Sequence, residues 1–174
     1  MAKTARTIVL IALMTACLTV VKQVLAVMPN VEGVSLLIAV FSATFGYVSI
    51  ISSTLFVVIE CFIWGFNTWV IGYFIYWPLL SIVFCLLSRR KLNNLSATIT
   101  IVVMTFLFGV ITSLVEVGLF SGSYDEFFTR FFIYYGRGIV FYIVHIVSNA
   151  IVFALLFERF RKVVDKLNKK YLPT

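Results

Sequence analysis

Six ionisable side chains lie within or at the ends of strongly apolar stretches: Lys22, Glu60, Glu116, Arg130, Arg137 and His145. Such groups are costly in hydrocarbon, so by default they face the interior of a helix bundle or a cavity. Lys22 has a second interpretation, because a long lysine side chain near a helix end can extend to the membrane interface. The set as a whole predicts a polar surface inside an apolar protein.

Residues three or four positions apart lie on the same side of a helix. Four groups with this spacing mix polar, small and aromatic residues: Ser53, Glu60, Trp64 and Asn67; Trp69, Tyr73, Tyr76 and Trp77; Thr105, Gly109, Thr112 and Glu116; Gly138, Phe141, His145 and Asn149. Small residues are also typical of close helix packing, and aromatic residues of an interfacial belt. Together the four faces predict one cavity, open to the outside, for an organic solute with rings and hydrogen-bonding groups.

Other chemistries lack the residues they need. The cysteines, Cys17, Cys61 and Cys85, lie apart in apolar runs, and neither a carboxylate cluster nor a Cys/His set has metal-ligand spacing. The sequence contains no H-E-x-x-H, G-x-S-x-G or G-x-x-x-x-G-K-[ST] motif. We therefore predict a protein that is not an enzyme and holds no metal or intrinsic cofactor, so ATP-driven transport would need a partner's nucleotide site.

The elements that must position these residues are membrane-spanning helices. Hydrophobic residues make up 62% of the chain and charged residues 12%, with a mean hydropathy of +1.09. A soluble domain carries about 25% charged residues. We predict an all-α, polytopic bundle of six transmembrane helices in a single domain over residues 1–174, with helices at 7–28, 33–45, 47–64, 68–87, 97–120 and 129–157 and a basic tail at 158–174.

Charge predicts the orientation and the division of the long apolar stretch 33–65. Most Lys and Arg residues flank apolar runs: Lys3 and Arg6, then Arg89, Arg90 and Lys91, then Arg159, Arg161, Lys162, Lys166, Lys169 and Lys170. A split near Gly46 places all three groups on the cytoplasmic side, as the positive-inside rule requires, although the helix at 33–45 is then short for a span. The loops at 29–32, 65–68 and 121–128 face outward. This pattern is not a nucleic-acid-binding stripe.

Several of these motifs also resemble a known family. The chain is similar over nearly its whole length to the substrate-binding S components of energy-coupling factor (ECF) vitamin transporters, on the strength of Ala12-Leu-Met-Thr-Ala16, Met28-Pro29-Asn30-Val31-Glu32, Glu60-Cys-Phe-Ile-Trp64-Gly65-Phe66-Asn67, Tyr76-Trp77-Pro78 and His145-x-x-x-Asn149. Together the motifs look like one subgroup of S components, similar to the cobalamin-type members, while other S components take riboflavin, folate, thiamine, pantothenate or queuosine precursors on the same scaffold. The glycine-rich second helix of folate-type members is not apparent.

The resemblance implies a binding protein in a bacterial cell membrane, with both termini cytoplasmic. It would act with a transmembrane coupling subunit, which Ala12 and Ala16 would contact, and with two cytoplasmic ATPases that bind ATP. The transported ligand would be a vitamin, with cobalamin as the first candidate. We expect the ligand to contact Glu32, Asn67, Trp69, Tyr73, Tyr76, Arg137, His145 and Asn149.

Other interpretations remain open from the sequence. The chain is also compatible with a small oligomeric secondary transporter in which Glu60 or Glu116 is the proton site. An intramembrane enzyme or assembly factor has no motif in its favour. The N-terminal apolar run resembles a signal peptide, but Lys22 and Gln23 lie near its end and no small-x-small cleavage site follows.

Overall fold

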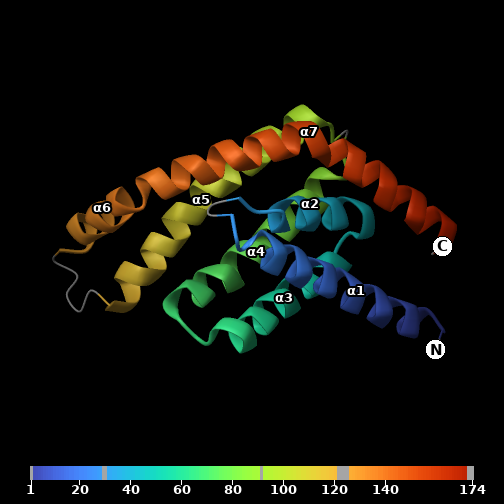
Figure 1. Cartoon of the computed structure of the whole chain (residues 1–174), viewed down its shortest axis with the longest axis horizontal. Coiled ribbons are helices and arrows are strands. Elements are labelled where there is room, and N and C mark those ends of the chain that lie inside the picture. The colour runs from blue at the N-terminus through green and yellow to red at the C-terminus, as the bar shows by residue number, and fades with distance from the viewer. Residues whose placement is uncertain (1, 29–30, 91, 121–125, 172–174) are drawn as a thin grey trace.

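The computed structural model describes residues 2–28, 31–90, 92–120 and 126–171, and the longer elements in these ranges are all α-helices. The helices are α1 (Ala2–Leu25), α2 (Val34–Phe45), α3 (Val48–Trp64), α4 (Thr68–Leu87), α5 (Asn94–Phe120), α6 (Phe127–Arg137) and α7 (Ile139–Tyr171), shown in Figure 1. The predicted loops at 29–32 and 121–128 lie partly outside the described residues. Lys91 lies wholly outside them.

Four stretches are long and apolar enough to cross a membrane: Thr4–Leu25, Thr68–Leu87, Asn94–Leu119 and Ile139–Lys170. Many of their large apolar side chains are exposed on the outside of the bundle, among them Val9, Leu13, Ile99 and Ile151. Such a surface is suited to lipid rather than to water. The chain therefore has the character of a helical membrane protein.

The two shorter helices, α2 and α3, have 12 and 17 residues. Helix α2 lies in the middle of the bundle, where it packs against α1, α3, α4 and α7. Eight of its residues are buried. Because protein surrounds this helix, its polar ends can be satisfied by neighbouring residues rather than by the membrane surface.

The division predicted near Gly46 coincides with the turn between α2 and α3. Gly46 has φ 65° and ψ −137°, a backbone conformation that favours glycine because other residues meet a steric penalty there. The same end of α2 is joined to its neighbours by a buried group of hydroxyls. Ser42, Ser49 and Ser81 lie within 2.7–2.8 Å of one another.

The last part of the chain differs from the single helix predicted at 129–157. Helix α6 ends at Arg137, and α7 then continues as one helix through the predicted basic tail to Tyr171. The two helices meet at Gly138, where the ring of Tyr142 lies 2.8 Å from the position a β-carbon would occupy. Together they form an arch over the rest of the molecule, and both termini lie at the same end (Figure 1).

Candidate ligand-binding pocket

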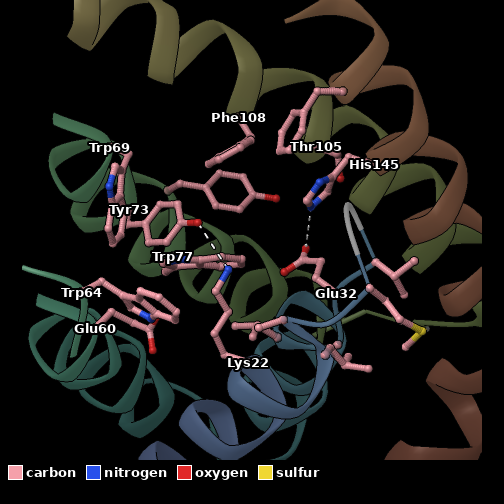
Figure 2. Close-up of a pocket in the computed structure, with 18 residues that line it drawn as sticks. Lys22, Glu32, Glu60, Trp64, Trp69, Tyr73, Trp77, Thr105, Phe108 and His145 are labelled. Atoms are coloured by element: carbon pink, nitrogen blue, oxygen red, sulfur yellow. Dashed lines mark hydrogen bonds and ion pairs between the residues drawn. The ribbon is translucent and has the colours of Figure 1, made fainter. Parts of the chain in front are cut away.

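A pocket of about 440 Å³ opens at the end of the bundle where α1 and α3 finish and α4 begins. Figure 2 shows the side chains that converge on it. They come from α1, the segment between α1 and α2, α3, α4, α5 and α7, and include Lys22, Glu32, Glu60, Trp64, Trp69, Tyr73, Tyr76, Trp77, Thr105, Phe108, Phe141 and His145. Most of the bundle therefore contributes to one site.

Helix α4 supplies an aromatic wall. Its residues Trp69, Tyr73, Tyr76 and Trp77 are spaced so that they share one helix face. The ring centroids of Trp69 and Tyr73 lie 4.9 Å apart, and those of Tyr76 and Trp77 lie 4.8 Å apart, both in edge-to-face geometry. Phe108 of α5 extends the wall, with its ring centroid 4.9 Å from that of Tyr76. Rings locked in this way offer flat faces to a ligand at little entropic cost.

The segment between α1 and α2 is tied to the bundle by Glu32, which is buried. Three donors converge on its Oε1 atom: the Ser35 hydroxyl, Asn149 Nδ2 at 3.2 Å and His145 Nε2 at 3.4 Å. Asn149 Nδ2 also donates to Thr105 Oγ1 at 3.0 Å, so the network joins the segment to α5 and α7. We call this network, formed by Glu32, Ser35, Thr105, His145 and Asn149, the Glu32 latch.

The charge state of the latch depends on the Glu32 carboxyl, which lies outside the helices. Burial alone would raise the pKa of this carboxyl. The contacts from His145, the Ser35 hydroxyl and the charge of Lys22 act in the opposite direction and leave the pKa of Glu32 below its usual value of 4.5. Glu32 is therefore an anion at neutral pH.

Two further ionisable side chains, Glu60 and Lys22, line the pocket. Glu60 of α3 is fully buried, and its Oε1 atom accepts a hydrogen bond from Gln23 Nε2 at 3.1 Å. Lys22 Nζ lies 3.5 Å from the Tyr73 hydroxyl and 5.5 Å from the centre of the Tyr73 ring. Lys22 thus points into the pocket (Figure 2) rather than away from it toward an interface.

Three buried polar atoms on the pocket wall have no hydrogen-bond partner among the described residues: Glu60 Oε2, Trp77 Nε1 and His145 Nδ1. Buried polar groups are nearly always paired, because an unpaired one costs about 1–3 kcal/mol. One of the three atoms is an acceptor, one is a donor and one can be either. The three residues that carry these atoms all line the same pocket, and such a group is typical of a site that is completed by a ligand.

Comparison with known proteins gives no match to a family model, to a curated protein or to a solved structure. The resemblance to S components therefore stays a prediction from the sequence.

The structure gathers most of the predicted ligand contacts. Glu32, Trp69, Tyr73, Tyr76 and His145 line the pocket, and Asn149 lies directly behind Glu32. Asn67 and Arg137, by contrast, are exposed and are not among the residues lining the pocket.

Several lining residues are absent from the predicted contact set, namely Lys22, Glu60, Trp64, Trp77, Thr105, Phe108 and Phe141. Phe108 follows Thr105 by three positions, so the helical spacing of that stripe would have included it. No group of three or more His, Cys, Asp or Glu in the described ranges is arranged to hold a metal ion.

Proposed function

We propose that this chain is the membrane-embedded substrate-binding subunit of an ECF-type importer for a vitamin or related micronutrient. One observation carries the proposal: three residues with unpartnered buried polar atoms line a single preformed cavity together with an aromatic wall. An empty apolar packing defect would not need an orphaned carboxylate oxygen, indole N–H and imidazole nitrogen around it. The resemblance in sequence supplies the transporter class.

The pocket favours a compact ligand. Its volume of about 440 Å³ lies in the range of about 300–1,000 Å³ that is typical of sites for small organic molecules. The ligand needs a flat ring for the α4 wall, a hydrogen-bond donor for Glu60 Oε2 and an acceptor for the indole N–H of Trp77. Cobalamin is the first vitamin to be tested as the ligand.

The proposed orientation places the pocket toward the cell exterior. The basic groups Arg89–Arg90 and Arg159–Lys170 flank the opposite ends of α4 and α7 from those that form the pocket. By the positive-inside rule that basic end is cytoplasmic. With α2 and α3 counted as two further crossings inside the bundle, the chain has six spans and both termini are cytoplasmic.

The partner surface in this proposal is the outer face of α1. Ala12 and Ala16 are exposed on that face, whereas Met14 and Leu18 are buried on the inner face. Two alanines one turn apart allow another helix to approach closely, because they carry little side-chain bulk. A coupling subunit docked there would transmit ATP hydrolysis from two cytoplasmic ATPases to the binding subunit.

Native mass spectrometry of the protein purified from its host membranes tests the ligand part of the proposal. We expect one small organic molecule to remain bound, and to be lost from Glu60→Gln. The test of the partner part is Ala12→Trp, which should abolish uptake in cells but leave ligand binding by the purified chain intact. Ile151→Trp, at another exposed position, is the matched control and should preserve both. Loss of binding in a folded Ala12→Trp sample would contradict this division of roles.

One observation also favours the secondary transporter as an alternative. Glu60 is a fully buried carboxyl on the pocket wall, and its Oε2 atom has no hydrogen-bond partner among the described residues, as a proton site would require. Glu116 is half-buried and does not line the pocket, so it is the weaker candidate of the two. Uptake by the purified chain alone in liposomes, driven by a pH gradient without ATP, would establish this alternative and exclude the importer subunit.

A further inference from the structure

Helix α7 is too long to lie entirely inside the membrane. Helix α7 has 33 residues, which span about 50 Å, whereas the hydrocarbon core is about 30 Å thick. Residues 139–157 contain no Asp, Glu, Lys or Arg, and the charged residues begin at Glu158. The segment 158–171 therefore continues as a helix beyond the apolar core.

This segment is fixed in its rotation by contacts on one face. Arg161 Nη1 donates to the carbonyl oxygen of Leu92 at 3.0 Å, and Thr44 Oγ1 donates to Asp165 Oδ1 at 2.6 Å. Val164, between them, packs against the hydrophobic core. The helix cannot turn about its axis without breaking these contacts, so its other faces have defined directions.

The two remaining faces differ in character. Phe160, Val163 and Leu167 follow one another at intervals of three and four, and 41–59% of their surface is exposed. A second face carries exposed basic residues at the same kind of spacing: Arg159, Lys162, Lys166 and Lys169. Residues 158–171 hold six Lys or Arg and two Asp or Glu, a net charge of +4. An exposed apolar stripe beside a basic face is the pattern of a helix that lies in a membrane interface.

We propose that residues 158–171 bind the surface of a membrane rich in anionic phospholipid, with Phe160, Val163 and Leu167 in the interface and the basic face on the phosphate groups. The basic face favours an anionic membrane surface over a neutral one, because each Lys or Arg near an anionic leaflet strengthens binding about fivefold. In Figure 1 the C-terminal part of α7 is the limb of the arch that descends toward the end of the molecule that holds the N-terminus. This inference does not depend on the nature of the ligand or on the importer.

The test uses the full chain with Cys17, Cys61 and Cys85 replaced by alanine and a nitroxide label at Leu167→Cys. The protein is reconstituted into vesicles of neutral phosphatidylcholine, or of phosphatidylcholine and phosphatidylglycerol in a 7:3 ratio. Electron paramagnetic resonance then measures collisions of the label with oxygen and with a water-soluble nickel complex. We expect the label to be shielded from nickel in the anionic vesicles and accessible in the neutral ones.

The variant Lys166→Gln/Lys169→Gln should shift the docked fraction about 25-fold toward the accessible form. The matched control, Arg89→Gln/Arg90→Gln, removes two basic residues elsewhere and should leave the label shielded. Equal shielding in both lipids, or docking of the lysine variant as in the parent protein, would overturn the proposal. A label that is accessible in both lipids, but shielded when a partner protein is added, would assign the stripe to that partner instead.

Discussion

Removal of Glu32 should destabilise the protein far more than its position between two helices would indicate. Three donors converge on one buried oxygen of this residue, and two of them, His145 and Asn149, lie on α7. Glu32→Ala leaves these donors without their acceptor, and because each buried donor left unpaired costs about 1–3 kcal/mol, we expect a total loss of about 3–5 kcal/mol. Glu32→Gln keeps an acceptor oxygen but loses the charge, and we expect a cost of about 1–2 kcal/mol.

Thermal unfolding in detergent, followed by tryptophan fluorescence, measures these differences. In a chain of this length about 1 kcal/mol corresponds to a Tm change of about 2–4 °C. We therefore expect Tm to fall by about 6–20 °C in Glu32→Ala and by about 2–8 °C in Glu32→Gln. Hydrogen exchange should rise at the same time in the segment between α1 and α2, because the latch holds that segment.

Glu116→Gln is the matched control, since Glu116 is a half-buried glutamate outside the latch. Its Tm should change by less than about 2 °C. The reasoning would be refuted by a Glu32→Ala protein that unfolds within about 2 °C of the parent. It would also be refuted by equal losses in Glu32→Gln and Glu32→Ala, since the retained oxygen would then contribute nothing.

Three further predictions follow from single contacts. Lys22→Met and Glu60→Gln should each lower the binding affinity for the co-purified ligand about tenfold or more in calorimetry, because a hydrogen bond to a charged group contributes about 1.5–3 kcal/mol. Unchanged affinity in both variants would show that these residues do not bind the ligand. The lowered pKa of Glu32 means that its contribution to stability is complete at neutral pH and is lost as the pH falls below 4.5, so Tm should drop in acid in the parent protein but show no such step in Glu32→Gln. Gly109→Leu should lower stability by about 1–3 kcal/mol, because two tyrosine rings lie 3.1–3.2 Å from the position that a β-carbon would occupy, whereas Gly118→Leu, with nothing within 4 Å of that position, should be tolerated.

Helix boundaries are predictable where local chemistry sets them. Gly46 marks the end of α2 through its backbone conformation, and the aromatic spacing of α4 places Trp69, Tyr73 and Tyr76 on one face wherever that helix packs. The break at Gly138 is not predictable in the same way. It depends on the ring of Tyr142 occupying the space beside the glycine, which is a packing event.

The positions of Asn67 and Lys22 depend on features that helical spacing alone does not record. Helical spacing puts Asn67 on the face of α3 that carries Glu60, but α3 ends at Trp64 and Gly65 has φ 79°, so the helical period does not continue to Asn67. Asn67 instead begins α4 in an extended conformation. Lys22 is ambiguous in the sequence because its direction depends on Tyr73, which lies 51 positions later in the chain. Contacts between distant helices fix these orientations, and a single sequence does not record them.

Glu32 both lines the pocket and contacts α7, so a ligand in the pocket can either leave the Glu32 latch intact or compete with it. A ligand that satisfies Glu60 Oε2, Trp77 Nε1 and His145 Nδ1 leaves Glu32 Oε1 with its three donors and so adds its contacts to an intact latch. A ligand that competes for Glu32 Oε1 must first separate those donors, and its net effect on stability is smaller. The two cases differ in a measurement: the first ligand raises Tm in the parent protein and also in Glu32→Ala, whereas the second raises Tm only where Glu32 is present. The orphaned atoms favour the first case, and a ligand-induced rise in Tm that vanishes in Glu32→Ala would show that the latch itself is the binding group.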